Sequence, residues 1–300
     1  MQPRSTIALI LLCAAATACD DGDQPPPADA PPVDIGFNKP TATLKANDKG
    51  AEVGPADLSC LGMPTTDTAT TVAVTLEATV KDFQNNTIVA NAGVTAFRGI
   101  DVAQPFDTQT ADADGKVSVT IPVGTKRFGF KMTDGASLDT LLLNQTVDPG
   151  MAMQTFSSIQ IVSKSTAATL SAFIGKTRTT GTGVLAGAMY DCADRPISNF
   201  IATVSSTPGA VAHLPGADTY YFDPTTPLPV RHTVRGSASS NGLFMVIELP
   251  VTPTAYVQVW GFPTDADLAS GQLKLIAELQ APVIADTVIT GSYEPLRTGT

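Results

Sequence analysis

Charged side chains are scarce in this chain of 300 residues, and basic ones are scarcest. Charged residues make up 15% of the sequence, and the 28 acidic residues outnumber the 18 basic ones, which gives a formal net charge of −10. A protein that binds nucleic acid would show a basic stripe, and one that binds anionic lipid through charge would show a polybasic segment. The sequence has neither, so we expect no nucleic-acid partner.

Metal ligands are also few. The chain has two histidines, His213 and His232, and four cysteines, two of which (Cys13 and Cys19) lie close to the N-terminus. Few cysteines and histidines therefore remain for a zinc site, whose four ligands are usually of these two types. Asp112-x-Asp114-Gly115 resembles the start of a calcium loop, but the expected glutamate is missing further on, so we interpret it as a hairpin turn. We expect neither a metal nor a cofactor.

Catalytic signatures are absent as well. The G-x-S-x-G string of a serine hydrolase does not occur. His213 and His232 lie in a segment rich in proline and glycine, and we interpret them as exposed polar residues. A pocket in which a carboxylate approaches His232 would instead favour a hydrolase. From the sequence we expect no enzymatic activity.

What the sequence does have is alternation with a period of two. Apolar residues occupy every second position in 72–80, again in 117–121 and again in 128–132, as half-buried strands require. Asn85-Asn86 and Asp114-Gly115 provide turns between these runs. Long apolar patterns of helical period are almost absent. The sequence therefore predicts an all-β protein built from antiparallel β-sandwich modules.

The first 34 residues read as a leader and a tether. Residues 1–18 combine Arg4 with the apolar run Ile7–Leu12 and then small residues, as an export signal does, and the run is too short to span a membrane. Ala16-Thr17-Ala18-Cys19 resembles a bacterial lipobox, although leucine is commoner where Ala16 stands. The resemblance implies that Cys19 is lipidated and that the protein is anchored in the cell envelope, at the outer membrane or the periplasmic face. The alternative is an ordinary cleaved signal. Residues 19–34 are acidic and rich in proline, which predicts a disordered, extended tether.

The first module, residues 71–162, follows a lead-in segment at 35–70. Within 71–150, the order of strands and turns, the string D-x-D-G-K at 112–116 and P-x-G at 122–124 resemble the carboxypeptidase regulatory-like domain. The resemblance implies a transthyretin-like β-sandwich and specifies a fold rather than a function. Asn91 stands where that family usually has glycine, and asparagine tolerates the left-handed backbone that such a turn requires. A hydroxyisourate hydrolase shares this fold, but its C-terminal Tyr-Arg-Gly-Ser signature is absent.

The second module, residues 183–300, reads as a degenerate copy of the first. Asp191 corresponds to Asp82, Asn199 to Asn91, and Asn241-Gly242 to Asp114-Gly115. The copy is longer between its paired turns, and the extra residues fall mainly in 206–235. Between the modules, residues 163–182 contain a predicted short helix at 165–174, with Ser163 or Ser165 as N-cap and Gly175 as its end.

Cys60 and Cys192 are the two thiols left after export and lipidation. The envelope outside the cytoplasm permits disulfides, so we predict a bond between them that clips the lead-in segment onto the second module and fixes the two modules relative to each other. The chain-entropy model gives about 4–5 kcal/mol for so long a loop. The alternative is two separate buried thiols.

Aromatic residues concentrate in the second module, where Tyr220, Tyr221 and Trp260 are the candidates for ligand binding. Exposed on a sandwich, they would stack on sugar rings; alternation favours core positions instead. The function that the sequence favours is that of a lipid-anchored envelope protein with a structural or interaction role. The alternative is carbohydrate binding through these aromatics. The expected partners are the membrane and a protein or glycan of the envelope.

Overall fold

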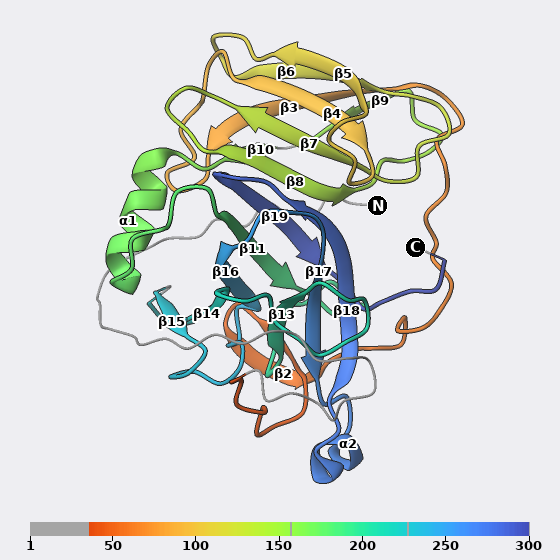
Figure 1. Ribbon diagram of the computed structural model, residues 1–300. Coiled ribbons are helices and arrows are strands. Elements are labelled where there is room, and N and C mark those ends of the chain that lie inside the picture. The colour runs from red at the N-terminus through yellow and green to blue at the C-terminus, as the bar shows by residue number, and fades with distance from the viewer. Residues whose placement is uncertain (1–35, 157, 227, 300) are drawn as a thin grey trace. The chain divides into compact units, whose positions relative to one another are not determined.

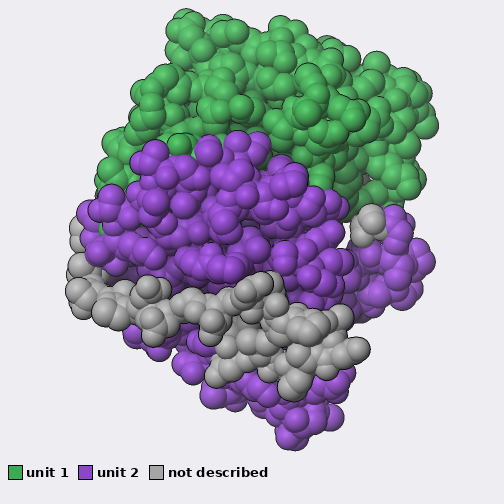
Figure 2. Space-filling model, in the orientation of Figure 1, with its two compact units in different colours: residues 1–11, 66–171, 286–290 green, residues 12–65, 172–285, 291–300 purple. Residues whose placement is uncertain are grey.

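A computed structural model describes residues 36–299 except residues 157 and 227. The leader, the lipobox with Cys19 and the tether at 19–34 all lie outside the described residues. Among the described residues, the chain forms two compact units (Figure 2): unit 1 contains 66–171 and 286–290, and unit 2 contains 36–65, 172–285 and 291–299. The lead-in segment up to Thr65 is therefore part of unit 2. In the part of the chain that is described, no helix is both long and apolar enough to cross a membrane.

Strands dominate both units, which confirms the predicted all-β class. Unit 1 packs two layers of strands around one core (Figure 1). The first layer has the order β10-β3-β6, with β9 also beside β3; the second has the order β19-β8-β7-β4-β5. The strands are β3 (Val74–Asp82), β4 (Gly93–Arg98), β5 (Pro105–Thr110), β6 (Lys116–Ile121), β7 (Phe128–Thr133), β8 (Asp139–Gln145), β9 (Met153–Thr155), β10 (Ile159–Ile161) and the first residues of β19 (Thr287–Tyr293).

The alternation in the sequence builds this core. In β3 the residues at 74, 76, 78 and 80 are buried and those between them are not, and β6 alternates in the same way. Phe128 and Phe130 of β7 are fully buried and meet edge to face, with ring centroids 5.3 Å apart. Each such side chain contributes about 1.5–3 kcal/mol of transfer free energy. The predicted positions of the first module are thus its core.

Not every strand pairing is antiparallel. β9 and β10 both run parallel to β3, and β19 runs parallel to β8. A parallel partner has to arrive over a crossover connection. β9 and β10 do so because the chain passes through β7 and β8 before it returns to β3. Periodicity indicates that a segment is a strand and is silent about its direction.

Two helices accompany the strands in the described residues. α1 (Lys164–Ile174) lies where the sequence predicts the connecting helix: the Ser163 hydroxyl accepts a hydrogen bond from the Thr166 amide, and Gly175 follows with a positive φ of 65°. α2 (Asp265–Ser270) was not predicted. It has a capping box between Thr264 and Asp267 and a left-handed Gly271 at its end.

The strands of unit 2 pair in the orders β12-β1-β2, β15-β14-β16-β11 and β13-β17-β18. The segment 206–235, which the sequence marks as the insertion in the copy, provides β14 and β15. The strands are β1 (Lys45–Asp48), β2 (Ala51–Pro55), β11 (Gly183–Met189), β12 (Ile197–Ser198), β13 (Ile201–Ser205), β14 (Asp218–Phe222), β15 (Pro229–Arg231), β16 (Leu243–Leu249), β17 (Thr252–Gly261) and β18 (Lys274–Val283).

The two units share a local construction at the positions paired in the sequence. Asn91 and Asn199 are both left-handed, with φ of 60° and 66°. The Asn91 amide donates to the Ala111 carbonyl, and the Asn199 amide donates to the Ala238 carbonyl. In each unit the carbonyl of a left-handed glycine accepts a hydrogen bond from a strand amide: Gly115 from Val80 of β3 at 2.8 Å, and Gly242 from Met189 of β11 at 3.0 Å.

Candidate functional site

A group of ionisable side chains lies at the start of β14. Asp218 is 2% exposed, and three cationic or hydroxyl groups surround its carboxylate. Arg231 Nε donates to Oδ1 at 2.8 Å and Tyr220 Oη donates to Oδ2 at 3.0 Å, while Lys176 Nζ lies 3.8 Å from Oδ2. Antiparallel pairing of β14 with β15 sets Tyr220 opposite Arg231, which explains why both reach the same carboxylate. We call Asp218, Tyr220, Arg231, His232 and His213 the Asp218 cluster.

The two histidines of the Asp218 cluster are not the exposed residues that the sequence suggested. His232 is 8% exposed, and its Nε2 lies 3.7 Å from Asp218 Oδ1. The Phe37 ring stacks on it at a centroid distance of 4.2 Å and meets His213 edge-on at 5.2 Å. The prediction failed because Phe37, nearly 200 positions away in sequence, covers the two rings.

Loss of solvent disfavours the charged form of both imidazoles. His213 Nδ1 accepts a hydrogen bond from the Val204 amide at 3.0 Å, a bond that needs the unprotonated nitrogen. Loss of solvent, and then the neighbouring His232, lower the pKa of His213 to about 4, against the opposing pull of Asp218. Loss of solvent also lowers the pKa of His232, although Asp218 pulls it the other way.

A carboxylate does approach His232, but the Asp218 cluster is not arranged for acyl transfer. The 3.7 Å separation from Asp218 is too long for the hydrogen bond that orients a catalytic imidazole. The Thr219 hydroxyl lies 3.5 Å from His213 Nε2, but it donates to the Ala202 carbonyl at 3.1 Å. The cluster is a charge-compensated buried network, whose ions need one another because each would be costly to bury alone.

The aromatic candidates for ligand binding are core residues. Tyr220, Tyr221 and Trp260 are 4%, 0% and 6% exposed, so their ring faces are not available to a sugar. Tyr221 Oη accepts from the Ala202 amide and Trp260 Nε1 donates to Gln258 Oε1, which satisfies their polar atoms inside the unit. The proposed stacking platform is therefore not formed by these residues. Both tyrosines are covered although they face opposite sides of β14, because this strand is buried along its whole length.

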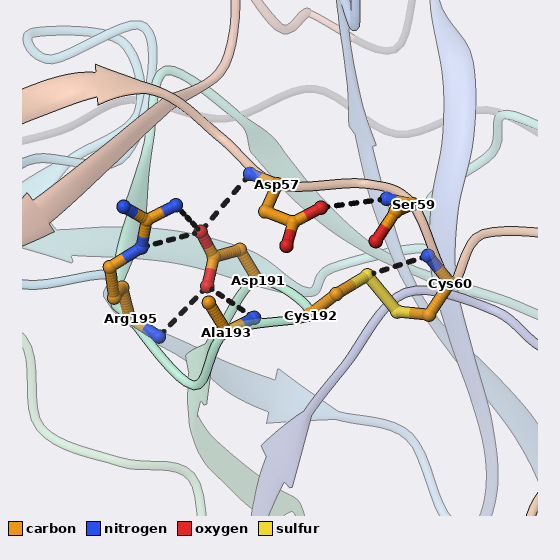
Figure 3. Close-up of a disulfide and its surroundings, with 7 residues drawn as sticks. All are labelled: Asp57, Ser59, Cys60, Asp191, Cys192, Ala193 and Arg195. Atoms are coloured by element: carbon orange, nitrogen blue, oxygen red, sulfur yellow. Dashed lines mark hydrogen bonds and ion pairs between the residues drawn. A yellow bond between two sulfur atoms is a disulfide. The ribbon is translucent and has the colours of Figure 1, made fainter.

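Cys60 and Cys192 form the predicted disulfide (Figure 3). Their Cα atoms are 5.8 Å apart, which suits a disulfide. The Cys60 amide also donates to Cys192 Sγ at 3.0 Å. Both residues belong to unit 2, which corrects one expectation: the bond clips the lead-in segment onto its own unit and does not tie one unit to the other.

Asp191, beside the disulfide, organises the junction, and sequence reasoning gave it no such role. Its carboxylate is buried: Oδ1 accepts the amides of Ala193 and Arg195, and Oδ2 accepts the Asp57 amide and the Arg195 guanidinium (Figure 3). The Cys192 amide returns a bond to the Asp57 carbonyl at 2.9 Å. The available signal was the match to Asp82, whose carboxylate also accepts two amides of its own turn.

The described residues hold no group of three or more His, Cys, Asp or Glu side chains that could bind a metal ion. The junction around the disulfide and the Asp218 cluster are two organised polar sites of unit 2. Cys19, the predicted lipid anchor, lies outside the described residues.

No protein-family model and no curated protein matches the chain. Among solved structures, the Bacillus anthracis TIE protein is 14% identical, with 75% of this chain and 34% of that one covered and a TM-score of 0.25. The shaft pilin SpaA from Lactobacillus rhamnosus GG is 11% identical, with 76% and 98% covered and a TM-score of 0.21. A streptococcal ancillary pilin is 13% identical, with 75% and 63% covered and a TM-score of 0.21. The aligned part spans about a third of the TIE protein. At these TM-scores no conclusion about function follows.

Proposed function

We propose that this chain is a lipid-anchored protein of the bacterial cell envelope whose β-sandwich units have a structural or interaction role and no catalytic one. The observation that supports this most is the Cys60–Cys192 disulfide. Disulfides persist in compartments outside the reducing cytoplasm. A leader at 1–18 and a lipobox-like Cys19 would deliver the folded units to such a compartment and hold them there.

The polar sites of unit 2 support a non-catalytic role. In the Asp218 cluster the carboxylate is already engaged by Arg231 and Tyr220, and at the junction the Asp191 carboxylate is engaged by Arg195 and backbone amides. Groups satisfied in this way stabilise an architecture rather than react. The buried aromatics give no support to the carbohydrate-binding alternative, so we do not propose it.

The anchor can be tested by substitution in a bacterium that processes lipoproteins. Cys19→Ser should abolish incorporation of labelled fatty acid and move the protein from the membrane fraction to the soluble fraction, because the thiol that accepts the lipid is lost. Cys13→Ser removes the neighbouring leader cysteine and is the matched control, which should behave like the natural chain. A Cys19→Ser protein that still partitions into detergent would show that the lipobox interpretation is wrong.

A further inference from the structure

The lead-in segment is built into unit 2 along most of its length. Leu44 is 1% exposed, and its amide donates to the Phe262 carbonyl at 2.9 Å. β1 pairs with β12 through Lys45–Ser198 and Ala46–Ile197, and Asn47 Nδ2 donates to the Pro196 carbonyl and to Ser198 Oγ. The lead-in segment therefore belongs to unit 2, although the residues that directly follow it in sequence, 66–171, belong to unit 1.

Contacts on both sides of Cys60 continue this attachment. On the N-terminal side, the Asp57 amide donates to Asp191 and the Cys192 amide donates to the Asp57 carbonyl. On the C-terminal side, the Gly62 amide donates to the Leu296 carbonyl at 2.8 Å, and the Thr65 amide donates to the Thr298 carbonyl at 2.9 Å. All of these partners belong to unit 2. The disulfide is the covalent member of a continuous set of attachments.

The disulfide also encloses most of unit 1. Cys60 and Cys192 are 132 positions apart, and residues 66–171 lie between them. The remaining part of unit 1, residues 286–290, lies outside the enclosed loop. A force that enters the chain before Cys60 and leaves it from unit 2 after Cys192 can pass across the sulfur–sulfur bond without passing through 66–171.

We propose that the Cys60–Cys192 disulfide routes tension from the N-terminal tether directly into unit 2 and keeps it out of residues 66–171. The physiological source of the tension rests on the proposed function, because the lipid at Cys19 is the fixed point against which the tether is pulled. The mechanical path itself depends only on the bond and on the chain order. The noncovalent attachments are short, since β1 and β12 share two residue pairs, so under sustained pull the covalent bond becomes the connection.

Single-molecule force spectroscopy tests this path directly. The chain from residue 19 onward, without lipid and in its oxidised form, is attached through the Cys19 thiol and through a click-reactive amino acid at position 270, an exposed site on α2. This geometry leaves residues 286–290 unpulled. In the oxidised protein the enclosed span should never add to the measured extension. Addition of a thiol reductant to the same held molecules should release the 132-residue span, roughly 45 nm at about 3.5 Å per residue.

A reporter thiol shows whether unit 1 stays closed. Ala96 is fully buried in unit 1, so an Ala96→Cys thiol reacts with a labelling reagent only when that unit opens. Under a force that unfolds unit 2, the oxidised protein should leave position 96 unlabelled, and the Cys60→Ser/Cys192→Ser variant should label it. Labelling of position 96 at zero force shows whether unit 1 of the variant is folded. If it is not folded, the extension released when held molecules are reduced tests the proposal instead. Release of the enclosed span before reduction, or equal labelling under force, would overturn the proposal. Neither readout involves lipid. A Cys19→Ser result that contradicts the lipid anchor would therefore not contradict the mechanical path proposed for the disulfide.

Discussion

At the scale of single residues, His213 and His232 link the packing of unit 2 to pH. Phe37 covers both rings, and the bond from the Val204 amide requires an unprotonated His213 Nδ1. The charged group that favours protonation of these rings is Asp218. Arg231 and Lys176 are the cations paired with the Asp218 carboxylate. Burial outweighs the carboxylate, so protonation of either ring opposes folding.

We predict that unit 2 loses stability between pH 6.5 and pH 4. The pKa of His213 is about 4 in the folded protein and about 6.5 in the unfolded chain, so the unfolded chain binds the proton first as the pH falls. The free energy of unfolding should drop by about 2–3 kcal/mol across that range. His213→Gln can still accept from Val204 and does not titrate, so its urea-unfolding free energy should fall less between pH 7 and pH 4.5. Equal pH dependence in both proteins would contradict the assignment.

Single residues also show how far sequence reasoning reaches. The left-handed backbone at Asn91 could be predicted, because asparagine stood at a turn that needs positive φ, and φ is 60° there. The burial of His232 could not, because it depends on the stacked ring of Phe37. Local backbone conformation can be predicted from neighbouring residues. Contacts between segments far apart in the sequence cannot be predicted in this way.

At the scale of elements, the lead-in strands have little stability of their own. β1 has four residues and β2 has five, and the residues of β2 are largely exposed. The sequence pattern of these strands gives only a weak strand signal. What holds them in place is contact with distant segments, since Leu44 packs against β17 and β1 pairs with β12. α2 is the opposite case: its capping box and Gly271 were visible in the sequence, and the six-residue helix buries nothing that a periodic pattern could reveal.

We predict that Gly261→Ala loosens the lead-in segment. A Cβ at this position of β17 would lie 2.6 Å from Leu44 Cδ2 and 3.0 Å from its Cγ, and the buried Leu44 has little room to move. The substitution should cost about 1–3 kcal/mol and speed proteolysis within 36–60. Gly135→Ala is the control, because a Cβ there meets nothing within 4 Å, and its unfolding free energy should change by less than about 0.5 kcal/mol. The assignment fails if the two variants are cut at the same rate.

At the scale of the whole molecule, the order of modules in the sequence is not the order in which the units are built. The chain enters unit 2, leaves it at Thr65 for unit 1, and returns after Ser171. The sequence could show two sandwich-like patterns and a pair of cysteines, but it could not show that 36–65 belongs with the later pattern. That membership depends on pairings such as Lys45 with Ser198, which lie more than 150 positions apart.

Reduction of the disulfide should therefore affect the two units unequally. Cys60 and Cys192 both lie in unit 2, so their bond restricts the unfolded state of the lead-in segment and of β11 and β12 most directly. We expect reduction to lower the unfolding free energy of unit 2 by about 2–4 kcal/mol. The core of unit 1, formed by strands such as β3, β6 and β7, contains neither cysteine and should keep its stability.

Hydrogen exchange resolved by segment measures both units in one sample: amides of β1 and β12 should exchange faster after reduction, and amides of β3 and β6 should not. Cys60→Ala/Cys192→Ala should reproduce the pattern without reductant. Equal loss of protection in both units would show that the bond stabilises the molecule as one cooperative body.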